Sequence, residues 1–331
     1  MPRRRHLGSP GGNSVDRLYL DFDQKVADWL AGRLRSSDQY GVYAYEDGAE
    51  ATFRIARARG VPAVYELPIG YWRTARRILE PELERWPEWR ATLINVDEPL
   101  WKLERKDREL DWADRIVVAS SFTRKSLEDY PGTLAPVEVI PYGAPTLPSL
   151  KTNSLATRAP GPLRALFVGS LGLRKGLPYL FAAAESLGSQ VKWTFIGQPV
   201  AECAALMEGL KAHRWIPTCP NTEILEEMRK HDILVLPSLF EGFGLVLIEA
   251  LAAGIPVIAT AHTAAPDLLT DGEAGFIVPV GDSQAIAAGL QRLVDEPDRL
   301  EDMKAKASAT AKRWTWERYA ALMESYLGSY G

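Results

Sequence analysis

Residues 232–260 read DILVLPSLFEGFGLVLIEALAAGIPVIAT. Two short apolar runs, 233–236 and 256–259, lie on either side of an apolar stretch from about 244 to 253, and Gly and Pro residues separate them. This pattern predicts a buried strand, a glycine-containing loop, a helix and a second buried strand. Strands that are apolar throughout and alternate with helices are typical of a parallel sheet covered by helices on both faces.

The same alternation extends in both directions from this stretch. Further strands are expected at 41–45, 62–67, 116–119, 137–140, 164–168, 191–196 and 276–278. Helices are expected at 16–34, 47–59, twice within 72–112, and at 121–130, 177–187, 200–212, 222–230, 282–294, 297–312 and 314–327. Ser120 or Ser121 is expected to cap the helix that follows the strand at 116–119. Such a series predicts doubly wound α/β folding, with ligands bound beyond the carboxyl ends of the strands.

A change of composition divides the chain. Residues 144–162 are rich in Pro, Ser and Thr, which is a linker composition. A chain of 331 residues is also long enough for two domains. We therefore predict two Rossmann-like domains that face a cleft. The predicted parts are a disordered segment at 1–15, an N-terminal domain at 16–145, a linker at 146–162, a C-terminal domain at 163–312, and a helix within 313–331 that packs across the junction.

Composition excludes several classes of protein. The net charge is −4, both signs are mixed along the chain, and the longest basic block is Arg3-Arg4-Arg5, so no nucleic-acid partner is expected. No apolar run approaches the roughly 18–20 residues of a membrane-spanning helix, and the N-terminus lacks an apolar signal core. Cys203 and Cys219 are too few for a disulfide framework or a four-ligand zinc site. A cytoplasmic protein is the expectation.

The loop at 237–244 is the first candidate binding element. Its glycines allow a ligand to approach the backbone, and the start of the following helix presents N–H groups and a positive dipole end that suit phosphate. Glu241 and Glu249 flank this anion site. They are consistent with binding hydroxyl groups, one on a sugar and one on a ribose. The alternative is that both are solvated acids, although the apolar helix leaves little solvated face for Glu249.

Two more loops follow strands that end at the same edge. Arg174 and Lys175 lie in FVGSLGLRKG (167–176), where a guanidinium and an ammonium group suit a diphosphate, or else form a surface turn. The segment is neither a Walker A loop nor a dinucleotide fingerprint. His262, in the loop at 259–267, is equally consistent with a ligand contact and with capping the loop. Asp21-Phe22-Asp23 resembles a metal-binding DxD motif, but its place in an amphipathic segment predicts surface acids.

Together these segments resemble the retaining glycosyltransferases of the GT-B fold, in the family 4 (group 1) type. The resemblance rests on 167–176, on 232–260 with the E-x7-E spacing of Glu241 and Glu249, and on PDLLTDGEAGFIVP at 266–279. It is weaker in the N-terminal half, in ADRIVVASSFTRKSL (113–127) and VIPYGAP (139–145). WTWERYAALMESYL resembles the family's crossover helix. The resemblance implies a metal-independent enzyme that moves a sugar from a nucleoside diphosphate to an acceptor hydroxyl with retention of configuration.

The resemblance also implies roles for individual residues. Glu241 would hold hydroxyls of the donor sugar and Glu249 those of the ribose, while Lys175 with Arg174 would neutralise the diphosphate. The remaining donor-binding positions are Phe243, Gly244 and Leu245 through their N–H groups, Trp215 and Ile216 beside the base, and Gly169, Ser170 and His262. No cofactor is implied beyond the nucleotide sugar itself. The acceptor would be a glycan, a lipid-linked molecule or a small molecule, and peripheral contact with a membrane is compatible with it.

The chain departs from the family pattern at several places. Ser170 stands where relatives usually have Arg, and Thr263-Ala264 replaces a Gly-Gly pair. Only about 40 residues precede the strand at 41–45, without a counterpart of the family's first strand and Gly-rich acceptor loop, so we expect a shortened N-terminal domain. A nucleotide-sugar-binding subunit or truncated remnant without turnover is the alternative function. A nucleotide-dependent oxidoreductase is disfavoured, because the dinucleotide fingerprint is absent.

Overall fold

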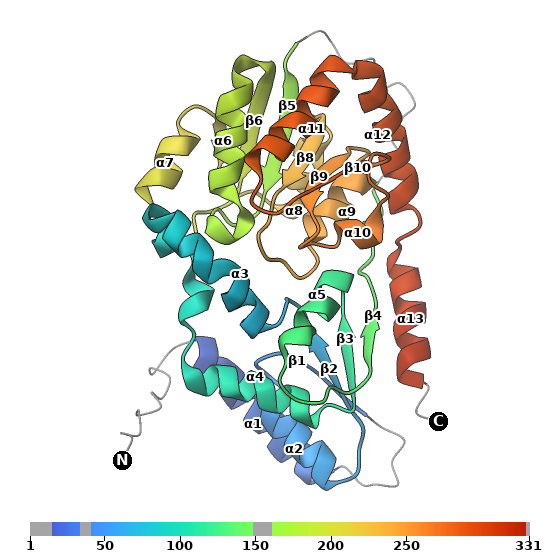
Figure 1. Cartoon of the computed structure of the whole chain (residues 1–331). Coiled ribbons are helices and arrows are strands. Elements are labelled where there is room, and N and C mark those ends of the chain that lie inside the picture. Colours follow the sequence, from blue (N-terminus) through green and yellow to red (C-terminus); the bar gives the residue numbers. More distant parts are fainter. Residues whose placement is uncertain (1–14, 34–40, 148–160, 329–331) are drawn as a thin grey trace.

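The structure is a computed structural model that describes residues 15–33, 41–147 and 161–328. It has two lobes, each built on a parallel sheet, which lie one above the other in Figure 1. Most of the predicted disordered segment and residues 148–160 of the predicted linker lie outside the described residues. Val15, which we assigned to the disordered segment, is instead the first residue of a helix.

The N-terminal lobe has a four-stranded parallel sheet in the order β1-β2-β3-β4. Apolar side chains from α1, α2 and α4 pack against one face of this sheet. On the other face, Val64, Val117 and Ile140 pack against Tyr319 and Met323 of the last helix, α13. The elements of this lobe are α1 (Val15–Ala31), β1 (Val42–Tyr45), α2 (Glu50–Ala58), β2 (Ala63–Leu67), α3 (Trp72–Arg85), η1 (Pro87–Thr92), η2 (Ile94–Asp97), α4 (Leu100–Trp112), β3 (Arg115–Val118), α5 (Ser121–Ser126), η3 (Leu127–Asp129) and β4 (Val137–Val139), where η marks a 3₁₀ helix.

The C-terminal lobe has a six-stranded parallel sheet in the order β10-β9-β8-β5-β6-β7. Helix α6 packs beside α11 and helix α9 beside α12, which gives two helical layers around the sheet. The chain returns to the N-terminal lobe through α13 (Figure 1). The elements of this part are β5 (Leu163–Val168), η5 (Leu173–Lys175), α6 (Leu177–Leu187), η6 (Gly188–Gln190), β6 (Val191–Ile196), α7 (Ala204–Leu210), β7 (Arg214–Ile216), α8 (Asn221–Met228), β8 (Ile233–Leu236), α9 (Leu245–Ala252), β9 (Val257–Thr260), α10 (Ala265–Leu268), β10 (Gly275–Val278), α11 (Ser283–Asp295), α12 (Pro297–Ala311) and α13 (Trp316–Gly328).

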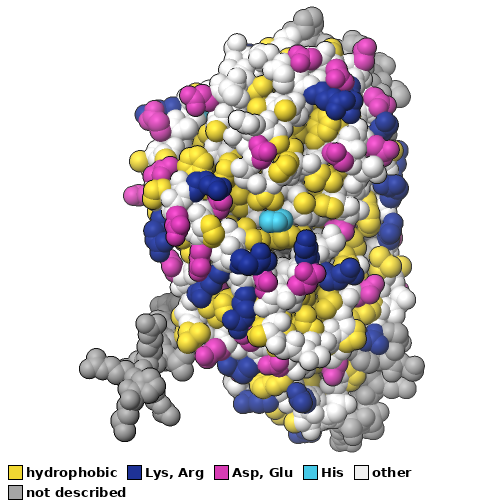
Figure 2. All heavy atoms as spheres, viewed as in Figure 1, with side chains coloured by type: hydrophobic (Ala, Val, Ile, Leu, Met, Phe, Trp, Pro, Cys, Tyr) yellow, Lys and Arg dark blue, Asp and Glu magenta, His cyan; other side chains and the backbone are white. Residues whose placement is uncertain are grey.

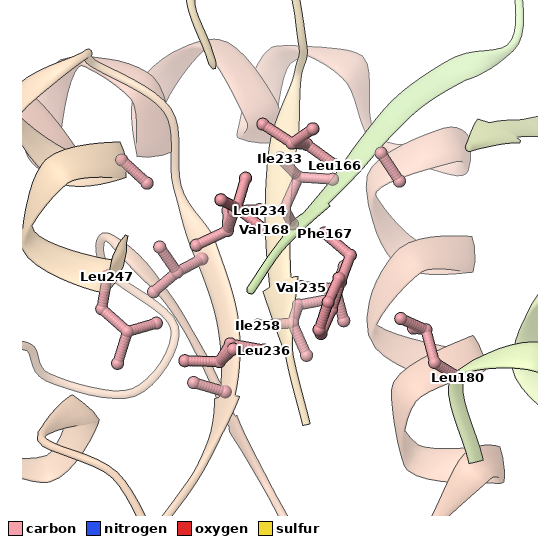
Figure 3. Close-up of a cluster of buried hydrophobic side chains, with 14 of the residues drawn as sticks. Leu166, Phe167, Val168, Leu180, Ile233, Leu234, Val235, Leu236, Leu247 and Ile258 are labelled. Carbon is pink, nitrogen blue, oxygen red and sulfur yellow. The ribbon is translucent and has the colours of Figure 1, made fainter. Parts of the chain in front are cut away.

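The core of the C-terminal lobe explains why its central strands are mostly apolar. Every residue of β8 is buried, and the central strands β5 and β8 pack on Leu180 from one helical layer and Leu247 from the other (Figure 3). A strand with helices on both faces has no solvated side, so side chains of both alternating sets must be apolar. The predicted strands of this lobe are confirmed on this basis.

Asp23 corrects one sequence prediction. Only about 2% of Asp23 is exposed, and its carboxylate accepts hydrogen bonds from the N–H groups of Ala51 and Thr52 at the start of α2. It also lies 3.0 Å from the guanidinium of Arg105. The prediction of a surface acid is therefore wrong for Asp23, which satisfies helix N–H groups and one buried cation. Asp21 is exposed, as predicted.

A segment of the N-terminal lobe packs into the core of the other lobe. Leu79 of α3, Trp89 of η1, Leu93 and Val96 are buried in the same apolar cluster as the β5–β8 core. In Figure 1 α3 lies between the lobes, and η1 contacts α7 and η5. This segment therefore belongs to the core of the C-terminal lobe, whereas the N-terminal sheet has a separate core. Across the described ranges, no helix is both long and apolar enough to cross a bilayer.

Candidate active site

The candidate site lies where the strand order of the C-terminal sheet reverses. The chain proceeds outward from β5 to β6 and β7, and then returns to β8 on the other side of β5. The loops that leave β5 and β8 diverge at such a switch point and leave a crevice for a ligand. Arg174 and Lys175 lie in the loop after β5, and Glu241 lies in the loop after β8.

These three side chains form one ion cluster. Lys175 Nζ donates a hydrogen bond to Glu241 Oε2, and Arg174 Nη1 lies 3.4 Å from the same oxygen and 3.0 Å from the carbonyl oxygen of Phe240. The side chains of Lys175 and Glu241 are only 11% and 12% exposed. Burial raises the pKa of Glu241, but the two cations outweigh burial and hold that pKa below its ordinary value. Glu241 is therefore an ionised carboxylate held between two cations.

The backbone fixes the distance between the two loops. The N–H of Leu239 donates to the carbonyl oxygen of Arg174 over 2.9 Å. Gly176 has φ +74°, and a Cβ at that position would lie 2.1 Å from the carbonyl oxygen of Pro237. Glycine is therefore required there on two counts, the left-handed conformation and the close approach of the two loops. This contact holds the Arg174-Lys175 turn against the loop that carries Glu241.

Helix α9 begins directly after Glu241. Its N-cap is Gly244, with φ +79°, and Leu245, at the first helical position, is 46% exposed. Phe243 is buried, and its ring lies 5.2 Å from that of Tyr142 in the segment that leaves the N-terminal lobe. Glu249 is half-buried, and its carboxylate accepts a hydrogen bond from the Asn221 side chain at the start of α8 over 3.2 Å. The positive end of α9 thus begins a few residues after Glu241 of the ion cluster, and Glu249 lies in the second turn of the helix.

The loops after β5, β6 and β7 meet along the same edge. Gly169 N–H donates to the carbonyl oxygen of Ile196, and Gly197 N–H donates to that of Ile216, both over 2.9 Å. Trp215 Nε1 donates to the carbonyl oxygen of Gly197 over 2.9 Å. Trp215 and Ile216 belong to a three-residue edge strand, β7, which we did not predict. Ser170, beyond Gly169, is exposed.

His262 connects the two lobes. Its Nδ1 lies 2.7 Å from the carbonyl oxygen of Leu239, so Nδ1 carries the proton, and its ring stacks at 4.5 Å on Phe122 of the N-terminal lobe. Burial lowers the pKa of His262, which keeps the ring neutral near pH 7 with Nε2 as an acceptor. On the face shown in Figure 2, a histidine lies near the level where the lobes meet, with Lys and Arg side chains gathered below it.

Several contacts between the lobes were not predicted from the sequence. The hydroxyl of Ser120, predicted as a helix cap, accepts a hydrogen bond from the N–H of Thr123. The hydroxyls of Ser120 and Thr123 also donate to the carbonyl oxygen of Gly242 in the other lobe, over 2.5 and 3.0 Å. The Asp267 carboxylate accepts the N–H of Ser121 over 2.8 Å. A Cβ on Gly242 would lie 2.0 Å from the carbonyl oxygen of Pro68. The cap was predicted from Ser120 and Ser121, but its partner 119 to 122 residues away in the sequence gives no local signal.

The carboxyl end of β2 adds a buried acid on the N-terminal side. Glu66 is about 1% exposed, and its Oε1 accepts a hydrogen bond from the Tyr142 hydroxyl over 2.6 Å. Burial raises the pKa of Glu66, against the lowering effect of that bond. Because Tyr142 also contacts Phe243, Glu66 is linked to the loop of the ion cluster through one intervening ring.

A pocket of about 1020 Å³ lies elsewhere, at the amino ends of β5 and β6. Its lining includes Arg164, Trp193, His213, Arg214 and His231, and none of the predicted site residues. Ligands of doubly wound sheets bind beyond the carboxyl ends of the strands, so size alone does not make this pocket the site. Its cations are also largely neutralised, since Arg164 pairs with Asp232 at 2.8 Å.

The chain is similar to several known proteins. Residues 156–310 match the family model described as glycosyl transferases group 1. The D-inositol 3-phosphate glycosyltransferase of Paenarthrobacter aurescens is 30% identical over 252 residues, which cover 69% of this chain and 61% of that protein. The enzyme of the same name from Streptomyces griseus is 33% identical over 159 residues, covering 45% of this chain and 34% of that protein. The chain thus spans between about a third and three fifths of the length of these relatives.

Solved structures show the fold. Sucrose-phosphate synthase from Thermosynechococcus elongatus aligns with a TM-score of 0.72 at 19% identity, over 98% of this chain and 82% of that one. HepE from Anabaena, solved in complex with UDP-glucose, aligns with a TM-score of 0.66 at 18% identity, over 93% of this chain and 82% of that one. The predicted fold, with two parallel-sheet α/β domains of GT-B type, is confirmed.

Proposed function

We propose that this chain is a group 1 glycosyltransferase that moves a sugar from a nucleoside diphosphate to an acceptor hydroxyl, with retention of configuration. The observation that carries the proposal is the buried cluster of Glu241, Lys175 and Arg174 at the switch point, next to the start of α9. The match of residues 156–310 to group 1 glycosyltransferases supports it, because that region contains all three residues.

The cluster suits departure of a diphosphate. The bond between the sugar C1 and the β-phosphate oxygen breaks, and the acceptor oxygen bonds to C1 on the same face. The acceptor proton passes to the departing phosphate oxygen. Negative charge grows on that oxygen, and Lys175 and Arg174 stabilise it in a site where little water competes. This role needs no metal ion, so activity should persist in a chelator.

Glu241 has a different task in each state. Without a donor it neutralises the two cations, which would otherwise be buried next to each other. When the diphosphate takes over those cations, the Glu241 carboxylate becomes free to accept hydrogen bonds from sugar hydroxyls. The exchange of partners would keep the two cations paired with a negative charge both before and after the donor binds.

The other predicted residues extend the donor site along the sheet edge. We assign the ribose hydroxyls to Glu249 and the base to the backbone of Trp215 and Ile216. The N–H groups of Phe243, Gly244 and Leu245 are assigned to phosphate or sugar oxygens at the start of α9. Gly169 and Ser170 would line the near side of the diphosphate, and His262 Nε2 would accept a hydrogen bond from a ligand hydroxyl.

The acceptor class is suggested by the relatives. Two relatives that match 69% and 65% of this chain are named D-inositol 3-phosphate glycosyltransferase, so a phosphorylated polyol is the first acceptor to test. A screen of UDP, GDP and ADP sugars by thermal shift would identify the donor, since a ligand at 100 times its Kd stabilises the fold by about 2.7 kcal/mol. Absence of a shift with every nucleotide would contradict the donor site.

Transfer assays on matched variants test the roles. Glu241→Gln and Lys175→Met should each lower kcat by about 10²-fold or more, as loss of one preorganised charged group does. Glu208→Gln and Lys211→Met remove an ion pair of the same lobe that is over 70% exposed, and should leave kcat unchanged. Wild-type kcat in both cluster variants would show that these residues have no catalytic role.

The alternative is nucleotide-sugar binding without turnover. The observation in its favour is the N-terminal sheet, whose four described strands follow each other in chain order, so the described part of that sheet has no switch point of its own. Stabilisation by one nucleotide together with no transfer to any acceptor, in preparations free of partner proteins, would favour this alternative over the enzyme.

A further inference from the structure

The segment of residues 86–93, which we call the η1 segment, belongs to the N-terminal lobe but packs on the other lobe. Trp89 is about 3% exposed, and its ring lies 6.0 Å from that of Phe181 on α6. Trp86 contacts the ring of Tyr179 at 5.5 Å, and the Sγ of Cys203 lies 3.4 Å from the carbonyl oxygen of Glu88. Two aromatic pairs and a buried thiol therefore hold this segment against α6 and the start of α7.

The η1 segment ends at a hydrogen bond with the donor loop. The backbone N–H of Leu173 donates to the Thr92 hydroxyl over 2.9 Å, and that hydroxyl donates to the carbonyl oxygen of Trp89 over 2.8 Å. Both Thr92 and Leu173 are almost fully buried. A Cβ on Gly172 would lie 3.0 Å from the carbonyl oxygen of Thr92, so the two backbones are in close contact. The residues that follow Leu173 are Arg174 and Lys175.

The position of the Leu173 amide determines where the two cations lie. Leu173, Arg174 and Lys175 form a single tight turn, η5, closed by the bond from the Lys175 N–H to the carbonyl oxygen of Gly172. A buried N–H group without an acceptor is costly. The turn is therefore held where the Leu173 N–H reaches the Thr92 hydroxyl. Leu239 holds the other side of the turn through its bond to Arg174. The turn is thus fixed between the N-terminal lobe and the loop of Glu241.

We propose that Thr92 is a positioning residue for the diphosphate of the donor, acting from the N-terminal lobe through Leu173 on Arg174 and Lys175. This inference rests on the proposed function of those two cations. A donor site needs its charged groups placed to within a fraction of an ångström, and a displacement of about 1 Å can cost 10²-fold in rate. Residues 86–93 are therefore part of the donor site, although they precede the linker and touch no ligand.

Three threonine variants test the proposal. Thr92→Val keeps the shape but leaves the Leu173 N–H without an acceptor, whereas Thr92→Ser keeps the hydroxyl. Thr74→Val is the matched control, because Thr74 is equally buried and its hydroxyl donates to Ser126 within the N-terminal lobe. Amide exchange of a peptide covering 170–176 should accelerate about tenfold or more in Thr92→Val and stay unchanged in Thr74→Val. Thr92→Ser should restore the slow exchange.

Kinetic and binding measurements separate positioning from stability. Thr92→Val should lower kcat about tenfold and weaken binding of UDP, GDP or ADP, whichever the wild type binds, with the acceptor KM unchanged. Thr74→Val should lose stability without either effect. If Thr92→Val does not fold, Gly172→Ala tests the same contact from the other side. Amide exchange requires no turnover, so it tests the contact between Thr92 and Leu173 even if the chain transfers no sugar. Wild-type exchange at 170–176 in Thr92→Val, or equal kinetic losses in both valine variants, would overturn the proposal.

Discussion

The ion cluster at the switch point can be tested with a double-mutant cycle on Lys175 and Glu241. Replacing Lys175 with Met leaves a carboxylate that is 12% exposed with Arg174 as its remaining cation, at 3.4 Å. Breaking a buried pair from one side costs about 3–5 kcal/mol. Since Arg174 retains part of the compensation, we expect Lys175→Met to lower the free energy of unfolding by about 2–3 kcal/mol, from that figure.

The partner variant and the double variant complete the cycle. Glu241→Gln leaves Lys175 and Arg174 next to each other without a carboxylate, so it also destabilises the donor-free protein. In the double variant Lys175→Met/Glu241→Gln, the Gln is no longer next to a buried ammonium group. The two losses should therefore be non-additive, with a coupling of about 1–3 kcal/mol measured by urea unfolding. The exposed pair of Lys211 and Glu208 should give a coupling below about 1 kcal/mol.

Activity should follow a different pattern from stability. The double variant recovers stability relative to the sum of the single variants, but it lacks both the cation that we propose for the diphosphate and the carboxylate that we propose for the sugar. Its kcat should stay about 10²-fold or more below wild type, as in Lys175→Met alone. Recovery of kcat together with stability would show that the pair is only structural. A coupling of zero would show that Lys175 and Glu241 do not interact in the donor-free protein.

Three further variants test the surroundings of the site. Burial raises the pKa of Glu46 to about 8, so its contribution to stability is complete below the unfolded pKa near 4.5 and is lost as pH rises through about 8. The urea midpoint of Glu46→Gln should therefore equal that of the wild type near pH 5 and exceed it at pH 9. Urea midpoints that change in parallel with pH in both proteins would contradict this. Asp23→Asn should lower the free energy of unfolding by about 1–3 kcal/mol, because it removes one of the carboxylates that pair with buried Arg105 and leaves Glu109 at 3.2 Å; a thermal melt within a degree of wild type would refute the reasoning. Gly242→Ala places a Cβ 2.0 Å from a backbone oxygen of the other lobe, so kcat should fall about tenfold, whereas Gly32→Ala, with open space around it, should leave kcat unchanged.

The central strands of the C-terminal lobe could be predicted for a physical reason. These strands lie between two helical layers, and burial on both faces requires nearly continuous apolar residues. Glycines separate these apolar runs from the helices. The helix expected at 177–187 has those bounds in the structure. The loops that carry Arg174, Lys175 and Glu241 were predicted to meet because parallel strands end at one edge. The structure brings them together there.

Features that depend on distant partners could not be predicted. Strand β7 has three residues, two of them half-buried, and it pairs with β6 at the edge of the sheet. It therefore contains no apolar run that could be recognised in the sequence. Asp23 lies in a sequence that reads as an ordinary amphipathic helix. Its burial arises only because α2 presents two N–H groups and α4 presents Arg105 at the same point. Local sequence records neither of these partners.

The domain boundary along the chain differs from the boundary between the packed cores. Composition places the boundary at the linker near 146–162, which separates the two sheets along the chain. The packing of the core does not follow this boundary. Leu79, Trp89, Leu93 and Val96 precede the linker, but they are buried with β5 and α6. The Leu173 amide next to the two cations donates its hydrogen bond to the hydroxyl of Thr92, which also precedes the linker. The proposed donor site thus takes residues from both lobes, and we expect a change at residues 86–93 to affect Arg174 and Lys175 without passing through the linker.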